Sequence, residues 1–513
     1  MAKQRNPDRF SILFRMEQML TSLSFLSHCW SRAMPLPVRN HSLQLEHLEG
    51  RVVPATFQPL AKVFAISDIQ ADDSFGTSVA IDGKYAVVGA KYATNAAGDT
   101  TGAVYFYQRY NSGTSTDETD DIWTLQRILT APDAADGDEF GASVSLIGTN
   151  IIVGAPKDDD AGDNSGSVYL FSSSGVQREK FTASDAASND FFGTSVNYVG
   201  NTLVVGAPGN DDSGNGSGSA YVFVSAGRSG WSEQQKLTAS DADSFDNFGY
   251  AVAVSGDSVV ISALNDEPAG AGSGSAYVFT RSGSTWSEQD KLTASDGAKF
   301  DSFGQSVGIS GDSVVVGAPG NSDDGDSSGS AYVFTRSGTT WSEQQKLTAS
   351  DAETFDSFGI SVGISGDTVV VGVEGDDDAA DAAGAVFSFK RSGTTWTEHQ
   401  KLTAPDAGDS DIFGRSVGID GDSVIVGAYI DTVGGVSAAG SAYMYSTLGG
   451  SSFQPIDKVT AIADIQDGDG HNAAVAIDGD VAVIGAHKFS NASGSDIGAA
   501  YVFARFDNAC QLD

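Results

Sequence analysis

The feature that most constrains this chain is a unit of about 55 residues that returns eight times. Its best copies, Lys291 to Gln345 and Lys346 to Gln400, are nearly interchangeable. A period of this length predicts a repeat architecture, in which each unit is one supersecondary element that needs its neighbours to bury a core. A Phe-Gly pair marks the register, at Phe75-Gly76, Phe140-Gly141, Phe192-Gly193, Phe248-Gly249, Phe303-Gly304, Phe358-Gly359 and Phe413-Gly414, with His471-Asn472 in the eighth position.

One repeat, from Gly304 to Phe358, is predicted to contain four short strands. Residues 306–309 alternate with period two, residues 313–316 form an apolar run, and a Gly-Asp turn between them makes the two antiparallel neighbours. A segment rich in Gly, Asp, Ser and Asn follows, and then two more strands at 330–335 and 341–347. Four antiparallel strands per repeat is the unit of a β-propeller.

The recurring aromatic residues are interpreted as packing residues. We expect each Phe of a Phe-Gly pair to lie between adjacent blades, where truncation would cost roughly 3 kcal/mol or more. Gly317 is expected at a strand end where a side chain would obstruct the chain. Four tryptophans recur in the fourth strand and would lie around the rim, so packing is favoured over a carbohydrate platform. They are Trp231, Trp286, Trp341 and Trp396.

The two ends of the repeat region are complementary. Residues 55–67 resemble the fourth strand of the last unit, whereas the eighth unit ends after a third strand at 499–504. Pairing the two would complete a blade and leave no free sheet edge. We therefore predict an all-β fold, a single propeller of eight four-stranded blades over 55–507, with an N-terminal segment at 1–54 and a C-terminal tail at 508–513. Seven blades, with an end unit docked outside the ring, is the alternative.

Charge and composition narrow the classes of partner. The formal net charge is −38 and the pI is near 4.2, which argues against nucleic acid because phosphate binding needs clustered Lys and Arg. No run of 18 apolar residues occurs, so we expect no membrane-spanning helix. The two cysteines, Cys29 and Cys510, exclude a disulfide framework.

The repeat motifs carry a family resemblance. At Phe192-Gly193 with Gly206-Ala207-Pro208, and at Phe303-Gly304 with Gly317-Ala318-Pro319, the chain resembles the FG-GAP repeat family. That family includes the integrin α-chain propeller and many bacterial extracellular proteins, and the resemblance implies a propeller for adhesion or ligand binding outside the cell. The integrin-type calcium loop is replaced here by a tight turn such as Ser310-Gly311-Asp312, so those calcium sites do not carry over.

The N-terminal segment, residues 1–54, is net basic and is interpreted as a targeting segment. Its apolar part, Met19 to Trp30, is interrupted by polar residues and is a poor secretory core. Residues 45–55, LEHLEGRVVPA, resemble a Leu-Glu-x-Leu-Glu-x-Arg-x-x-Pro-Ala element near the N-terminus of many large secreted or surface proteins of planctomycete bacteria. We therefore expect a signal for export and an extracellular or cell-surface location.

All eight repeats have an Asp-x4-Asp pair before the Phe position, and a second acidic set lies between strands two and three, at 158–163, 211–212, 323–326 and 376–381. In a four-stranded meander both loops emerge at the same end, so one face of the disc should be acidic. Oxygen ligands suit Ca²⁺, and we hypothesise calcium binding in the longer loops. Turn capping is the simpler interpretation of the Asp-x4-Asp pairs. The candidate calcium ligands are Asp158, Asp160, Asp163, Asp211, Asp212, Asp323, Asp324, Asp326, Asp376, Asp378 and Asp381.

The sequence offers no catalytic constellation. The six histidines are scattered and the expected inner strands carry mainly Ser, Gly and Ala, so neither a hydrolytic triad nor a histidine zinc site can be assembled. We expect a monomeric, non-catalytic binding or adhesion propeller, assisted by calcium, with an unknown protein or polysaccharide ligand. The alternatives are a structural surface or matrix protein and an enzyme acting on polysaccharides, which would need convergent carboxylates in a cleft, one with a raised pKa. The irregular loops at 93–101, 110–121 and 429–439 are the expected ligand loops.

Overall fold

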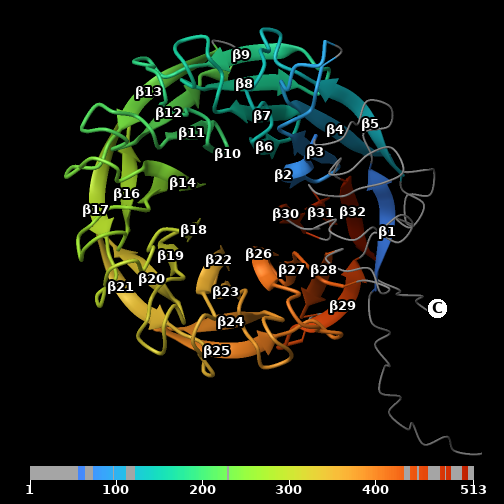
Figure 1. The fold of residues 1–513 in the computed structure, drawn as a ribbon, viewed down its shortest axis with the longest axis vertical. Coiled ribbons are helices and arrows are strands. Elements are labelled where there is room, and N and C mark those ends of the chain that lie inside the picture. Colours follow the sequence, from blue (N-terminus) through green and yellow to red (C-terminus); the bar gives the residue numbers. More distant parts are fainter. Residues whose placement is uncertain are drawn as a thin grey trace, which may run out of the picture. The chain divides into compact units, whose positions relative to one another are not determined.

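Eight four-stranded antiparallel sheets make up the part of the chain that the structure, a computed structural model, describes. The described residues are 56–63, 73–95, 97–110, 122–227, 230–432, 440–447, 450–459, 474–479, 481–486 and 499–506. They belong to one compact unit, Val53–Asp513, in which the sheets are arranged as blades around a central axis (Figure 1). The all-β propeller of eight blades is confirmed.

The strand bounds follow the predicted four-strand repeat closely. The first four blades, each from the inner strand outward, are β2 (Phe75–Asp82), β3 (Tyr85–Ala90), β4 (Ala103–Tyr110) and β5 (Ile122–Leu129); β6 (Ser143–Ile147), β7 (Asn150–Ala155), β8 (Ser167–Ser172) and β9 (Gln177–Phe181); β10 (Ser195–Val199), β11 (Thr202–Ala207), β12 (Ser219–Ser225) and β13 (Trp231–Leu237); and β14 (Phe248–Ser255), β15 (Ser258–Ala263), β16 (Ser275–Ser282) and β17 (Thr285–Leu292).

The remaining blades repeat the same order. They are β18 (Ser306–Ser310), β19 (Ser313–Ala318), β20 (Ser330–Ser337) and β21 (Thr340–Leu347); β22 (Phe358–Ser365), β23 (Thr368–Val373), β24 (Ala385–Ser392) and β25 (Thr395–Leu402); β26 (Phe413–Asp420), β27 (Ser423–Ala428), β28 (Ser441–Ser446) and β29 (Gln454–Val459); and β30 (Ala474–Asp478), β31 (Val481–Ala486), β32 (Ala499–Phe506) and β1 (Thr56–Val63).

The ring closes as the two chain ends predict. Strand β1 pairs antiparallel with β32, from Thr56 opposite Phe506 to Val63 opposite Ala500, and the two ends of the colour range meet there (Figure 1). A second link crosses the same seam, since the Gly83 amide between β2 and β3 donates to Asp478 Oδ2 of β30 at 2.5 Å. Closure of this kind removes a free sheet edge that could pair with another chain.

The hydrophobic core lies between adjacent blades, and the Phe of each Phe-Gly pair is part of it. Phe248 is fully buried and packs in one cluster with Val204 and Val222 of the preceding blade. Its ring lies edge-on to Tyr277, with 5.3 Å between ring centroids, an arrangement that aromatic pairs favour. The expected wedge between blades is therefore confirmed.

The Gly of the Gly-Ala-Pro motif permits the close approach of one blade to the next. A Cβ added to Gly317 would collide with the carbonyl oxygen of Gly359, the glycine of the next Phe-Gly pair. The recurring tryptophans are packing residues as expected, because Trp286, Trp341 and Trp396 are buried. Trp231 is half-buried and its ring lies edge-on to Phe181.

Several predictions from the sequence fall outside the described residues. Among these are the domain boundary at 54, the targeting segment with the element at 45–55, both cysteines, His471-Asn472, most of the loops at 110–121 and 429–439, and the tail from 508. Within the described part of the chain, there is no helix with the length and apolar character needed to cross a membrane.

Candidate ligand face and its lysine-centred clusters

The two acidic loop sets lie at the same end of each blade, as the meander predicts. We call this end the acidic face; it comprises the loops between the second and third strands and the connections that lead into each blade's first strand. In the blade β10–β13, Lys236 of β13 contacts both kinds of loop, since it pairs with Asp185 before β10 and with Asp212 between β11 and β12. Two loops that share one ammonium group must lie side by side.

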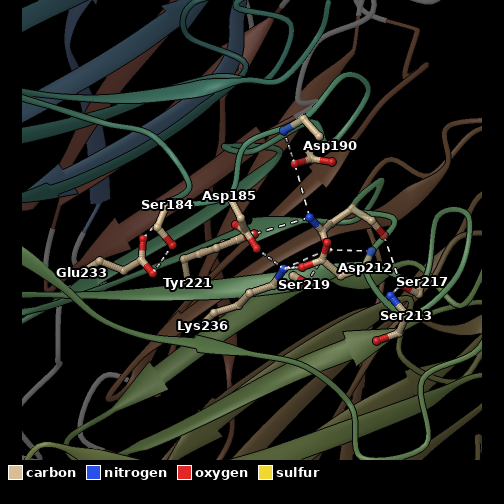
Figure 2. A network of polar contacts seen from close by, with 12 residues as sticks. Ser184, Asp185, Asp190, Asp212, Ser213, Ser217, Ser219, Tyr221, Glu233 and Lys236 are labelled. Carbon is tan, nitrogen blue, oxygen red and sulfur yellow. Dashed lines mark hydrogen bonds and ion pairs between the residues drawn. The ribbon is translucent and has the colours of Figure 1, made fainter. Parts of the chain in front are cut away.

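The cluster around Lys236 is a compact polar network (Figure 2). The Lys236 ammonium donates to Asp185 Oδ2 at 2.6 Å and to Asn210 Oδ1 at 3.1 Å. The Tyr221 hydroxyl donates to Asp185 Oδ1 at 2.7 Å. Burial raises the pKa of Asp185, but the bonds from Lys236 and Tyr221 outweigh burial and hold it below its usual range. The cluster therefore fastens the connection that enters a blade to that blade's own outer strand.

The same cluster recurs around the ring. Every member has a lysine at the end of a fourth strand and at least two carboxylates from the acidic face. The six clusters are Lys180 with Asp133, Asp158 and Asp160; Lys236 with Asp185, Asp212 and Asn210; Lys291 with Asp241 and Asp266; Lys346 with Asp296, Asp323 and Asn321; Lys401 with Asp351, Asp376 and Asp378; and Lys458 with Asp406 and Asp431.

Six of the eleven candidate calcium ligands belong to these clusters. In two of them, three carboxylates supply oxygens within 4.8 Å of one another, a spacing at which they could hold a metal ion. These two groups are Asp133, Asp158 and Asp160, and Asp351, Asp376 and Asp378. Asp212 and Asp323 each join a cluster that has two carboxylates and an asparagine.

The other five candidates do not converge. Asp211 caps its own loop by accepting the Gly216 amide at 2.7 Å. Asp163, Asp326 and Asp381 are exposed and accept, through their backbone carbonyl groups, amides of the neighbouring connection. Asp324 is exposed as well.

The fit of Ca²⁺ to the three-carboxylate groups depends on the lysine. Oxygen atoms are the right donors, and Oδ1 of Asp351 and of Asp376 is buried with no hydrogen-bond partner among the described residues. However, the Lys401 ammonium lies 2.6 Å from Asp376 Oδ2 and 2.7 Å from Asp378 Oδ2, and so already supplies positive charge there. A calcium ion would have to displace that ammonium.

In six of the Asp-x4-Asp pairs the second aspartate caps a turn, as the simpler interpretation predicted. Asp246 Oδ2 accepts the Asp243 amide at 2.6 Å, and equivalent bonds fix Asp138, Asp190, Asp301, Asp356 and Asp411. Burial, with neighbouring carboxylates, raises the pKa of Asp138, Asp246 and Asp356 to about 6. These carboxylates are structural parts of the connection between blades.

The blade β14–β17 has an open pocket on the acidic face. At the loop position where other blades have a clamping carboxylate, such as Asp212 or Asp323, the loop between β15 and β16 has Pro268. Among the described residues, Lys291 pairs with two carboxylates, those of Asp241 and Asp266. The pocket has a volume of about 510 Å³ and is lined by Asp241, Asp243, Ser244, Asp246, Asp266, Glu267, Pro268 and Lys291.

The six lysines are not among the residues predicted for the site, although the sequence contains a signal for them. In a chain with a net charge of −38, a lysine recurs at the same place in six repeats, and in all six it lies two residues before a Thr-Ala pair. Such recurrence of a scarce cation marks a structural partner for the equally recurrent aspartates. In the six described clusters, the first aspartate of the Asp-x4-Asp pair, which the simpler interpretation assigned to turn capping, forms an ion pair with that lysine.

Comparison with known proteins agrees with this architecture. The fold is an eight-bladed β-propeller whose FG-GAP motifs recur in register. The chain belongs to the FG-GAP repeat family. The family model matches residues 58–107, 123–171, 176–223, 231–279, 286–334, 341–389, 396–445 and 455–503. No curated protein matches the chain.

A solved structure shares the fold alone. The crystal structure of the Chaetomium thermophilum Sqt1 aligns with a TM-score of 0.51 at 12% sequence identity, over 88% of this chain and 98% of that one. At this identity the likeness extends to the fold and to nothing further.

Proposed function

We propose that this protein is a non-catalytic binding propeller that acts in adhesion outside the cell, at the cell surface, and that the acidic face is its ligand face. The observation that carries the proposal is a set of carboxylates with no structural task. Asp243, Glu267, Asp324, Glu353 and Asp377 are exposed, and within the described residues their side chains have no hydrogen-bond or ion-pair partner. They lie on loops fixed by the lysine-centred clusters, which pre-organise the face.

The location outside the cell is supported by the family resemblance and by the export-like N-terminal segment. The test is to express an epitope-tagged full chain in the organism that encodes it and to treat intact cells with protease. Loss of the tag from intact cells, with a cytoplasmic marker preserved, is the expected result. Protection of the tag until the cells are lysed would contradict the proposed location.

The proposal includes calcium binding at the two three-carboxylate groups and not at the other candidate ligands. Their support is the convergence of oxygens within 4.8 Å and the unpartnered buried atoms of Asp351 and Asp376. Because an ammonium group competes for the same oxygens, we expect calcium to bind weakly, at millimolar concentrations of the extracellular type. Equilibrium dialysis of the full chain with ⁴⁵Ca measures this directly, and no binding at millimolar calcium would remove this part of the proposal.

A carboxylate enzyme is the second candidate function, and the pocket is the observation in its favour. Within the pocket, burial raises the pKa of Asp246 to about 6. Burial also acts on Asp241, but the hydrogen bonds from Lys291 and Tyr277 outweigh it and lower the pKa of Asp241. Opposite shifts of this kind suit an acid and base pair. The same pair of bonds recurs at Asp185 and Asp190, outside the pocket, which favours a structural role. Release of reducing sugar from polysaccharides, abolished by Asp246→Asn, would establish the enzyme instead.

A structural matrix protein is distinguished by self-association. The monomer that we expect would sediment as a single species over a wide concentration range in analytical ultracentrifugation. Concentration-dependent growth of large species, in the absence of any ligand, would favour the matrix role.

A further inference from the structure

Three phenylalanines stand exposed on the acidic face at the same place in three consecutive repeats. Phe245, Phe300 and Phe355 each precede the capping aspartate of an Asp-x4-Asp pair, and their exposed fractions are 60%, 69% and 67%. In the other described repeats this place is taken by Gly137, Asn189 and Ser410. Large apolar side chains exposed on one face of a protein are candidate contacts for a partner.

The backbone at these positions is unfavourable for phenylalanine. Phe245, Phe300 and Phe355 have φ angles of 73°, 66° and 72°, in the left-handed region that suits Gly and Asn. Residues held in this region are concentrated at functional sites, where the surrounding structure imposes the conformation. Since the three rings are exposed, burial does not offset the cost, and selection for a contact outside the chain would account for them.

The backbone that carries the three rings is held in place by hydrogen bonds. The amides of Phe245, Phe300 and Phe355 donate to carbonyl groups of Asn215, Ala271 and Asp326, each in the loop of the preceding blade, at 2.7, 2.9 and 2.7 Å. The ring of Phe245 lies over Gly216 and that of Phe300 over Gly272, where a Cβ would be 3.7 and 3.5 Å from the ring. An aromatic side chain on a fixed backbone has few torsion angles left to order, so it contributes affinity with little loss of conformational entropy.

The surroundings of the rings are anionic. Phe245 is flanked by Ser244 and Asp246, both of which line the acidic pocket created by Pro268. That pocket has five carboxylates and one lysine, and two of the carboxylates, Asp243 and Glu267, are exposed and have no side-chain partner among the described residues. Lys299 beside Phe300 is an exposed cation in the same arc.

We propose that the arc of Phe245, Phe300 and Phe355 binds an extended polypeptide segment rich in arginine and lysine, with one basic side chain in the pocket beside Phe245. This inference rests on the proposed function and names its partner. Charge complementarity selects a cation, and the pocket walls satisfy its donors with carboxylates. The rings receive the aliphatic stems and the flat guanidinium groups, as aromatic faces commonly do.

The test compares variants in binding a fluorescein-labelled peptide of alternating arginine and glycine, measured by anisotropy with the full chain in about 0.15 M salt, where exposed charges are screened beyond ~8 Å. The triple variant Phe245→Asn, Phe300→Asn, Phe355→Asn leaves the net charge unchanged. We expect it to bind at least about tenfold more weakly, because buried aromatic anchors dominate interface affinity. Its melting temperature should equal or exceed that of the unmodified chain, since Asn189 occupies the equivalent left-handed position with a φ of 67°.

Two single variants on the opposite, tight-turn face are the matched controls. Val176→Asn removes a side chain that is 61% exposed between β8 and β9, and Asp422→Asn removes one exposed charge between β26 and β27. Both should bind the peptide as the unmodified chain does. Glu267→Gln, which also removes one charge but from the pocket, should weaken binding about threefold or more, in proportion to one exposed ion pair.

The outcomes separate the two claims. Three results would overturn the proposal of a cationic partner. The triple variant could bind the peptide as tightly as the unmodified chain, or Asp422→Asn could weaken binding as much as Glu267→Gln does. The third result is that the chain binds cellohexaose in place of the peptide. In those cases the proposed function still stands if the chain is retained on cells through its acidic face. Absence of that retention would contradict the proposed function itself.

Discussion

The side-chain amide of Asn210 donates a hydrogen bond to the buried carboxylate of Asp190 at 3.3 Å. Asn321 makes the same bond to Asp301. In the other clusters an aspartate, such as Asp266, occupies the position of the asparagine. The charge of Asp266 adds to the effect of burial and raises the pKa of Asp246 further. The repeats therefore contain two natural versions of one contact.

This difference predicts the effect of Asp266→Asn. The substitution gives Asp246 an amide donor in place of a carboxylate, and so should lower its pKa from about 6. At pH 7.5, where Asp246 is ionised, the substitution should raise the melting temperature more, or lower it less, than at pH 5, where Asp246 is protonated. Asn210→Asp is the reverse variant and should show the opposite dependence on pH. The same change at both pH values would contradict the role assigned to Asp246.

The pH dependence of the unmodified chain follows from two groups of aspartates. Folding raises the pKa of Asp138, Asp246 and Asp356 to about 6, above the usual value of 3.8. The folded state therefore binds more protons between pH 7 and pH 4, and stability should rise as the pH falls through 6.

The first aspartates of the pairs act in the opposite direction. The pKa of Asp133, Asp185 and Asp241 is lowered by folding despite their burial, because lysine and tyrosine bonds stabilise the carboxylates. Their contribution is complete above the usual pKa and is lost as the pH falls through the lower folded value. Melting temperatures measured from pH 8 to pH 2 should thus pass through a maximum near pH 4 to 5, and a steady decline from pH 8 downward would refute this assignment.

Removal of a clamping lysine tests the clusters and calcium together. Lys401→Met leaves the buried carboxylate of Asp376 with no counter-charge and should destabilise the fold by roughly 2 kcal/mol, less than the ~3–5 expected for a fully buried pair. Millimolar Ca²⁺ should restore much of that loss, because three carboxylates are then free to bind it. Lys291→Met, with two carboxylates, is the matched control and should recover less.

The two kinds of phenylalanine should respond oppositely to truncation. Phe303 is fully buried between blades, whereas Phe300, three residues earlier, is 69% exposed. Phe303→Ala should cost about 3–5 kcal/mol in the free energy of unfolding. Phe300→Asn should be neutral or stabilise by up to about 1 kcal/mol, because it relieves the left-handed strain. Chemical denaturation of both variants at pH 7.5 measures the contrast.

The blades could be predicted from the sequence because their determinants are local and repeated. Phe303, Gly317 and the period-two strands return at fixed spacing, and the sequence of the two ends reveals the closing strand. The lysine-centred clusters could not be predicted in the same way, because Lys236 contacts Asp212 and Asp185, which lie 24 and 51 residues away in the chain. Phe245 has no signal in hydrophobic periodicity, since its exposure and left-handed backbone become apparent from the three-dimensional arrangement alone.

The most direct measurement is carboxyl footprinting of the full chain, free and bound to intact cells of its own organism, with a carbodiimide label read by mass spectrometry. We predict protection of the acidic-face residues Asp243, Glu267, Asp324 and Glu353, while the exposed tight-turn residues Asp257, Asp312, Asp367 and Asp422 remain labelled as in the free chain. Equal labelling of both sets in the bound chain, or protection confined to the tight turns, would contradict a ligand face at the acidic end of the propeller.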